Sequence, residues 1–214
     1  MGRKPDVAVR ARILEEAEHV IHLKGYKSAC LDEIARAAGM TKANLFHHYG
    51  SKSQLGLAVL DFKIAEFRKR RVEPLCAQQA PEKAVEAMFE EGAAFFHGIG
   101  CRAGCFLGNI ALEMSDCDEA FRERVGRFFA DWAAGMAACL ERCKKAGYFG
   151  PQLDSKAAAE AIVAMYEGAI MLTRSQRDAK IFKRVGVVAR SILEQHKKKN
   201  RRDNTMGPKT PCGC

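Results

Sequence analysis

The sequence predicts an all-α fold. Across the chain, apolar residues recur three or four positions apart, as on the buried face of a helix, and no segment alternates as a strand does. Gly, Pro and capping residues separate these periodic segments. Near the N-terminus two of the segments are short and are joined by a tight turn, which is the pattern of a helix-turn-helix. With 48% hydrophobic residues, the 214-residue chain can bury a sizeable core in one or two domains.

Residues 31–52, LDEIARAAGMTKANLFHHYGSK, hold the two short helical patterns. Gly39 suits the left-handed conformation that often ends a helix, and Thr41 is a good N-cap for the next helix. In this second helix Leu45 and Tyr49 are spaced to face inward, while most of the other residues are polar. A short helix with two apolar anchors and many outward donors is typical of the second helix of a helix-turn-helix, which enters the major groove of DNA.

Longer helical patterns precede and follow this motif. Ser51, Asp154 and Asp178 are the expected caps of three later helices, and Ser115 with Asp118 resembles a capping box. The helices predicted outside the motif are 7–24, 52–71, 81–98, 105–114, 115–146, 154–175 and 178–196. The predicted parts are a helix-turn-helix domain at 1–52, a connecting helix at 52–72, a C-terminal domain at 73–196 and a disordered basic tail at 197–214.

The net charge of +9 is concentrated at the two ends of the chain. Residues 1–72 carry 14 Lys or Arg against 8 Asp or Glu, residues 73–196 carry 15 against 17, and residues 197–214 carry 6 against 1. Attraction to phosphate supplies most non-specific affinity for DNA, and basic charge beside a helix-turn-helix suits it. The alternative is a basic surface that serves only solubility. It explains the total charge, but it explains less well why the charge lies beside the helix-turn-helix.

The chain lacks the sequence features of secretion and of membrane insertion. Charged residues interrupt the N-terminus, and no apolar core of a signal peptide follows them. No stretch reaches the roughly 18 apolar residues that a membrane span requires. We therefore expect a cytoplasmic protein with no membrane partner, in which the nine cysteines are mostly reduced thiols.

The string GMTKANLFHHYGSKSQL resembles the signature of TetR/AcrR-type bacterial transcriptional regulators: a glycine turn, Ser or Thr, a small residue, Leu, an aromatic, His, an aromatic and then Ser-Lys. The preceding helix, followed by Gly25 and Tyr26, fits the first helix of the same family. This resemblance implies an N-terminal three-helix DNA-binding domain and a C-terminal helical domain that binds a ligand and dimerises. It also implies a ligand-responsive dimeric regulator, most often a repressor released by a small-molecule effector, and not an enzyme.

The resemblance also implies a homodimer, because in this family paired helices of two subunits form a four-helix bundle. The last two predicted helices are the expected interface. Their small and β-branched residues are Ala157, Ala161, Ala164, Ile170, Val185, Val188 and Ile192. A two-fold pair of short recognition helices reads a palindromic double-stranded operator, which one helix alone reads with little specificity.

By the resemblance, the DNA contacts lie on the second helix of the motif and its flanks. The candidate residues are Thr41, Lys42, Ala43, Asn44, Phe46, His47, His48 and Lys52. The first two lie where a helix N-terminus meets phosphate, and an Asn side chain can pair with adenine through two hydrogen bonds. For the two histidines, the alternative is a solvated pair on the helix surface.

Three positions depart from the family pattern. Phe46 stands where Tyr is frequent, so a hydroxyl contact to phosphate is missing and an apolar contact to a thymine methyl group takes its place. Cys30 occupies a capping position that Ser or Thr usually holds, which predicts a weaker cap. Ala29 lacks a hydroxyl that family members often place near the backbone.

The C-terminal domain is expected to contain the effector pocket, because it is rich in Met and aromatic residues that make adaptable walls for an apolar ligand. Most of these side chains are ordinary core. The candidate pocket residues are Phe96, Phe106, Asn109, Glu113, Trp132, Met136 and Tyr166.

Cysteines suggest an alternative, a thiol-based sensor of oxidants or electrophiles. Cys105 lies at the predicted start of a short helix, where the helix N-terminus lowers the pKa of a thiol, and Cys101 or Cys117 is its candidate partner. The segment GCFLGN resembles one in TetR-type regulators, some of which respond to electrophiles through a cysteine. The opposing interpretation is that free cysteine is a small buried apolar residue.

We expect no cofactor and no metal. Cys139 and Cys143 lie four apart in one helix, so their Cβ atoms are about 5–6 Å apart and too distant for a disulfide. The two CxxxC pairs lack the spacing of a recognised zinc finger, although four thiolates can bind zinc. A thiol-dependent enzyme lacks any supporting motif, and a non-specific architectural DNA-binding protein remains an alternative because of the basic tail.

Overall fold

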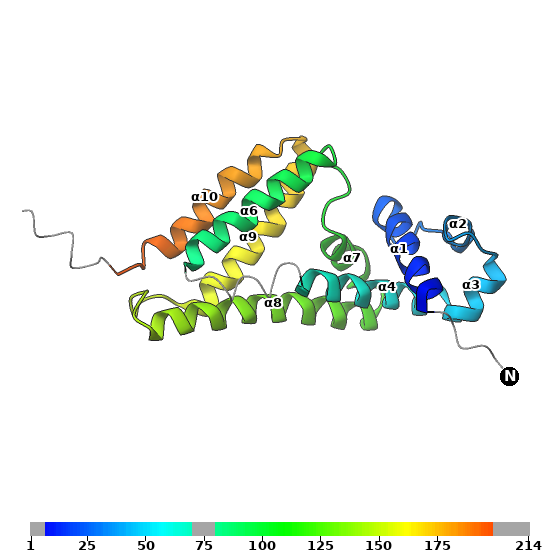
Figure 1. Cartoon of the computed structure of the whole chain (residues 1–214), viewed down its shortest axis with the longest axis horizontal. Coiled ribbons are helices and arrows are strands. Elements are labelled where there is room, and N and C mark those ends of the chain that lie inside the picture. The colour runs from blue at the N-terminus through cyan, green and yellow to red at the C-terminus, as the bar shows by residue number, and fades with distance from the viewer. Residues whose placement is uncertain (1–6, 70–79, 199–214) are drawn as a thin grey trace, which may run out of the picture.

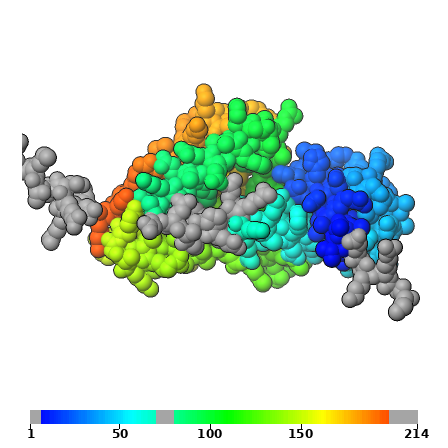
Figure 2. Space-filling model, viewed as in Figure 1, coloured from blue at the N-terminus to red at the C-terminus, as the bar shows by residue number. Residues whose placement is uncertain are grey.

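The computed structural model describes residues 7–69 and 80–198, which are almost entirely helical, so the predicted all-α fold is confirmed. Helices α1 (Val7–Lys24), α2 (Leu31–Ala37) and α3 (Lys42–Tyr49) form an N-terminal headpiece, defined here as residues 7–49, at one end of the elongated molecule (Figure 1). Helix α4 (Lys52–Phe67) leads from the headpiece into the rest of the protein. In the space-filling view the headpiece forms a terminal lobe (Figure 2).

The C-terminal domain contains α6 (Pro81–Gly98), α7 (Phe106–Met114), α8 (Glu119–Lys145), α9 (Ser155–Gln176) and α10 (Lys180–Glu194). Helix α8 runs along one side of the molecule, beneath α4 at one end and below α9 at the other (Figure 1). Helices α6, α9 and α10 pack together away from the headpiece, and α7 lies between the two parts. No described helix combines the length and apolar composition that crossing a membrane requires.

Aromatic side chains form the centre of the C-terminal core. Trp132 of α8 is 1% exposed and meets Phe67 of α4 at 4.7 Å and Tyr166 of α9 at 5.6 Å between ring centroids. The rings of Phe96 and Phe182 stack at 5.3 Å and join α6 to α10. These edge and stacked contacts add to the free energy of area burial, so they fix the relative positions of five helices.

A glycine lets the headpiece pack closely against α8. A Cβ atom on Gly56 of α4 would lie 2.4 Å from the ring of Tyr26 and 2.9 Å from that of Phe121. The Tyr26 and Phe121 rings themselves meet at 4.8 Å. The headpiece and the C-terminal domain are therefore joined through a contact that only a residue without a side chain permits.

The helix caps agree with the sequence in most places. Thr41 and Ser51 each accept a backbone hydrogen bond, from Asn44 at 3.2 Å and from Gln54 at 3.1 Å. Cys30 makes no side-chain cap, as its residue type predicts.

The predicted capping box at Ser115 is wrong. Ser115 ends α7, and α8 begins at Glu119, where Asp118 accepts hydrogen bonds from the amides of Ala120 and Phe121. The charged Asp118 carboxylate is the stronger acceptor, and residues 115–117 form the turn between the two helices.

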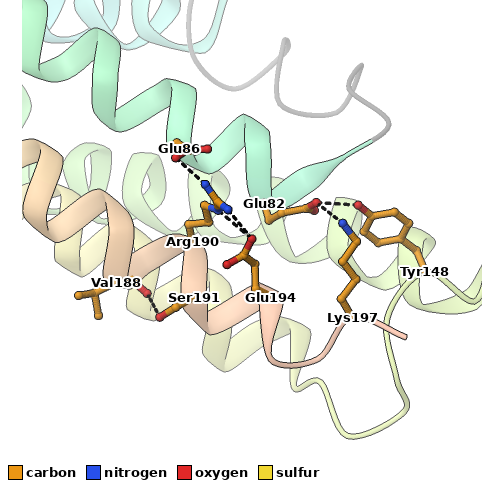
Figure 3. A network of polar contacts seen from close by, with 8 residues as sticks. All are labelled: Glu82, Glu86, Tyr148, Val188, Arg190, Ser191, Glu194 and Lys197. Atoms are coloured by element: carbon orange, nitrogen blue, oxygen red, sulfur yellow. Dashed lines mark hydrogen bonds and ion pairs between the residues drawn. The ribbon is translucent and has the colours of Figure 1, made fainter. Parts of the chain in front are cut away.

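A polar network closes the end of the domain that is distant from the headpiece (Figure 3). Glu82 of α6 is 2% exposed and accepts hydrogen bonds from the Tyr148 hydroxyl at 2.7 Å and from Lys197 Nζ at 2.8 Å. Arg190 of α10 bridges Glu86 and Glu194, each at 2.7 Å. The network therefore ties α6 to α10 and to the turn after α8.

The folded domain extends beyond the predicted boundary at residue 196. The backbone of Lys198 donates to Tyr148, and Lys197 pairs with Phe149 in an isolated β-bridge. The start of the predicted tail is therefore ordered. Its remaining residues, 199–214, lie outside the described residues, as do Arg70 and Arg71 at the predicted end of the connecting helix.

Candidate DNA-binding surface and effector cavity

The second helix of the motif, α3, has two buried anchors and an exposed polar surface. Leu45 and Tyr49 are 1% and 6% exposed, which is the inward face that the sequence predicts. The candidate DNA contacts Thr41, Lys42, Ala43, Asn44, Phe46 and His47 are exposed. The helix therefore presents a continuous surface of donors together with the ring of Phe46.

The two lysines of this surface already have partners. Lys42 Nζ lies 2.8 Å from the Asp32 carboxylate of α2, and this hydrogen bond lowers the pKa of Asp32 and raises that of Lys42. Lys52 Nζ donates to the Lys27 carbonyl at 2.9 Å and lies 5.1 Å from the centre of the Tyr26 ring. Sequence reasoning missed these partners because they are distant in the chain. A phosphate bound by either lysine would have to replace or share that lysine's present contact.

The two histidines of α3 differ in exposure. His47 is exposed, whereas His48 is half-buried and its Nδ1 atom is enclosed without a hydrogen-bond partner in the described residues. His47 is therefore the better placed of the two for contact with a base. Arg10 of α1 lies over the Tyr49 ring at 5.0 Å and adds a cation beside the recognition helix that the motif did not reveal.

A cavity of about 220 Å³ lies between the headpiece, α4 and the C-terminal helices. It is lined by His22, Lys63, Glu66, Phe67, Phe95, Phe96, Gly104, Cys105, Phe106, Leu107, Tyr166 and Ile170. Three of the predicted pocket residues, Phe96, Phe106 and Tyr166, are among them. A wider groove of about 680 Å³ lies between α8 and α9. Half of its lining residues are alanines, and the others include Phe129, Val163 and Glu167.

Four predicted pocket residues do not line this cavity. Trp132 and Met136 are 1% and 4% exposed and belong to the buried face of α8, so they serve packing. The Asn109 amide donates to the Ala103 carbonyl at 2.8 Å and holds the loop before α7. Glu113 points toward the headpiece, where it accepts two backbone hydrogen bonds. Sequence periodicity could not separate these roles, because all four types occur in both cores and pockets.

The polar groups of the cavity come from the N-terminal part of the chain. His22 Nε2 lies 3.0 Å from the Gly104 carbonyl, and Lys63 pairs with Glu66 at 2.8 Å and with Glu18 at 3.5 Å. Burial raises the pKa of Glu18, but its hydrogen bonds with His22 and Lys63 outweigh burial and hold the pKa below its ordinary value. The cavity therefore touches the headpiece directly.

Cys105 lies in the cavity wall as the N-cap of α7, where its sulfur accepts a hydrogen bond from the Gly108 amide at 3.3 Å. The prediction of a lowered thiol pKa is wrong. Burial raises the pKa of Cys105 well above its ordinary value, and the neighbouring Glu167 carboxylate raises it further. These two effects exceed the effect of the helix N-terminus, which lowers the pKa of a thiol.

The candidate partners of Cys105 are separated from it or enclosed. Cys117 follows the C-terminal end of the nine-residue α7, and Cys105 precedes its start. At about 1.5 Å per residue the helix alone separates them by roughly 13 Å, whereas a disulfide needs Cα atoms within about 7 Å. The two cannot form a disulfide in this fold. Cys101 is 5% exposed, and Cys117 is exposed with Lys27 Nζ 2.9 Å from its sulfur.

Cys139 and Cys143 of α8 form no disulfide within the described residues. Within residues 7–69 and 80–198, no group of three or more His, Cys, Asp or Glu side chains is arranged to hold a metal ion. The terminal cysteines Cys212 and Cys214 lie outside the described residues.

Comparison with known proteins gives the family. Residues 13–59 match the profile of the bacterial regulatory proteins of the tetR family, and residues 81–188 match the C-terminal domain of LmrA/YxaF-like transcriptional regulators. The chain belongs to the TetR family of bacterial transcriptional regulators. The predicted family and its fold are therefore confirmed, and TetR regulators are not enzymes, as expected.

Individual TetR proteins cover most of the chain. The transcriptional regulator AcuR of Cereibacter sphaeroides is 30% identical over 173 residues, which are 78% of this chain and 77% of AcuR. The crystal structure of a TetR regulator from Chloroflexus aurantiacus matches with a TM-score of 0.79 at 25% identity, over 89% of this chain and 96% of that one. The reduced form of Escherichia coli NemR, a transcriptional repressor, has the same fold, with a TM-score of 0.77 at 19% identity and coverage of 86% and 97%.

Proposed function

We propose that this TetR regulator is a homodimeric repressor that a small-molecule effector releases from a palindromic operator. The observation that carries the proposal is the cavity, which is walled on one side by α1 and α4 and on the other by α6, α7 and α9. A ligand there contacts both the headpiece and the C-terminal domain. It can therefore favour one headpiece orientation over another, as any effector with different affinities for two states does.

The proposed operator contacts are residues of α3 and its flanks, most of which are exposed. They are Thr41, Lys42, Ala43, Asn44, Phe46, His47, His48 and Lys52. Phosphate contacts set the register on DNA, whereas base contacts set the sequence, so Asn44 and His47 are the proposed readers. Because such an operator is chromosomal, we also propose a cytoplasmic location.

The proposed dimer surface lies on α9 and α10. Val187 and Val188 are 63% and 53% exposed, and Met171 on α9 is 62% exposed, although all three are apolar. Contiguous exposed apolar side chains mark interaction surfaces. Ile170 belongs to the cavity wall instead, because it is 5% exposed and faces the α4 side of α9.

The effector that this cavity favours is small and mainly apolar. Rings of Phe96, Phe106 and Tyr166 supply most of its wall, and His22 and Lys63 supply the polar groups that orient a ligand. If the effector lowers the affinity for DNA by some factor, bound DNA must lower the affinity for the effector by the same factor.

A second candidate function is thiol-based sensing, favoured by the position of Cys105 in the same cavity wall. An electrophile that enters the cavity would meet this thiol at the start of α7, whose other end contacts the headpiece. The effector in this case is attached covalently. The raised pKa of Cys105 requires that another group assist the reaction.

Selection of bound DNA from a random library, with and without an α,β-unsaturated carbonyl compound, tests both functions. A two-fold symmetric consensus supports the dimeric repressor. Loss of operator binding that Cys105→Ser abolishes supports the thiol function, and an unchanged wild-type affinity rejects it. A specificity ratio near one between selected and random DNA favours the architectural alternative and contradicts the repressor.

A further inference from the structure

The Cys105 thiol and the Glu167 carboxylate lie between the cavity beside the headpiece and the groove between α8 and α9. Cys105 lines the cavity beside the headpiece, and Glu167 lines the groove between α8 and α9. The two side chains are close enough that each shifts the pKa of the other. The contact joins the start of α7 to the middle of α9, which come together only in the folded chain.

Gly108 makes the space for this contact. A Cβ atom at Gly108 would lie 2.5 Å from Glu167 Oε2 and 3.4 Å from Cys105 Cβ. The carboxylate therefore occupies the volume that a side chain would otherwise fill on the first turn of α7. Because Gly108 donates its amide to the Cys105 sulfur as well, one residue positions both groups.

The Glu167 carboxylate is incompletely satisfied. Its Oε1 atom is enclosed and has no hydrogen-bond partner in the described residues. Burial raises the pKa of Glu167 to about 7, and only the hydrogen bond with Cys105 opposes this. An enclosed carboxylate without a cation is costly for stability, so packing alone does not account for it.

The charged groups around the pair are engaged elsewhere. On the cavity side, His22 of α1 and Lys63 of α4 pair with Glu18, and Glu66 pairs with Lys63. Arg174 of α9, near Gly104, donates to Asn109 at 3.3 Å, and Lys156 faces Glu160 at 3.9 Å at the groove. The basic side chains of α1, α4 and α9 that face this region are therefore engaged, and no ion pair with Cys105 or Glu167 is described.

We propose that Glu167 is the general base that removes the proton from the Cys105 thiol when an α,β-unsaturated carbonyl compound occupies the cavity. This inference rests on the thiol function proposed above. Among the described residues, no cation beside Cys105 lowers the pKa of its thiol. A neighbouring base can activate the thiol instead, because it removes the proton while the sulfur attacks and not before.

The addition balances within the site. The Cys105 sulfur forms a bond to the β-carbon, its proton moves to a Glu167 oxygen, and the electron pair of the carbon–carbon double bond moves toward the carbonyl as an enolate. Glu167 then returns the proton to the α-carbon. The product is a thioether, and no oxidant or reductant is consumed.

The test is the pH dependence of Cys105 alkylation in the full-length protein. N-ethylmaleimide is the probe, and peptide mass spectrometry separates Cys105 from the other cysteines. In the wild type, the rate should rise with a midpoint near the pKa of Glu167, about 7, and then level off. In Glu167→Gln this step should vanish, with a rate about 100-fold lower at neutral pH that rises only as the thiol itself ionises.

Matched variants separate the possible failures. Glu90→Gln, an exposed change on α6, should keep the wild-type profile, and Glu167→Asp should keep a step at reduced rate. An identical profile in the wild type and Glu167→Gln overturns the role of Glu167 while leaving the thiol function intact. Absence of Cys105 labelling at every pH overturns both. Melting temperatures confirm that each variant is folded.

Discussion

Glu113 Oε2 accepts a hydrogen bond of 2.8 Å from the backbone amide of Tyr26, and Oε1 of the same carboxylate accepts one of 2.7 Å from Lys27. Glu113 lies at the C-terminal end of α7, and Cys105 caps its start in the cavity wall. One helix of nine residues therefore connects the cavity with the turn between α1 and α2. We expect a shift of α7 along its axis to reach the headpiece through these two hydrogen bonds.

Replacing Glu113 tests this connection. In Glu113→Gln the amide can accept only through its oxygen, so one of the two backbone donors is left unpaired. We expect a loss of about 1–3 kcal/mol in the free energy of unfolding, measured by urea denaturation. Glu15→Gln, an exposed change on α1, is the control and should alter stability by less than about 0.5 kcal/mol. Equal stability of the two variants would show that the carboxylate is not the connection.

Two glycine substitutions of the same kind should have opposite effects. Alanine normally stabilises a helix interior by about 0.5–1 kcal/mol relative to glycine. Gly126→Ala on α8 meets nothing within 4 Å and should show this gain. Gly56→Ala places a methyl group 2.4 Å from the Tyr26 ring and should lower the melting temperature, because the headpiece must move away from α8. A stabilised Gly56→Ala would contradict the close packing described above.

Stability should depend on pH through Glu82. Burial raises its pKa, but the hydrogen bonds from Lys197 and Tyr148 outweigh burial and hold the pKa below its ordinary value. The stabilisation is therefore present above the unfolded-state pKa of about 4.3 and is lost as the pH falls through the lower folded-state pKa. Glu82→Gln should cost about 1–3 kcal/mol at pH 7, and this difference should shrink in acid. A difference that does not change between neutral and acidic pH excludes the carboxylate as its source.

On DNA, two substitutions should have distinct signatures. Lys52→Ala should weaken binding to all sequences and reduce the slope of log affinity against log salt by about one unit, because a phosphate contact is lost. Asn44→Ala should relax preference at particular base positions with little change in the slope. Fluorescence anisotropy over a salt series measures both. An unchanged slope in Lys52→Ala would mean that its amine stays with the Lys27 carbonyl when DNA is bound.

The headpiece could be predicted from local signals. Gly39 and Thr41 determine where α2 ends and α3 begins, and Ser51 determines where α4 begins. The spacing of Leu45 and Tyr49 determines which face of α3 is buried. These features depend on neighbours within four residues, which the sequence displays directly. The C-terminal site could not be predicted in the same way. Trp132 and Tyr166 are both aromatic residues on the apolar face of a helix, but only Tyr166 lines the cavity.

The sequence alone determined the helical fold, the recognition helix and the family, since short-range spacing and capping carry that information. The tertiary structure decided the chemistry of the proposed effector site. It buried Cys105 and brought Glu167 from α9 beside it, and burial above all reversed the expected shift of the thiol pKa. It also directed Glu113 to the headpiece instead of the pocket. The physical reason is that burial and electrostatic neighbours depend on which helices pack together, and residues far apart in the chain supply them.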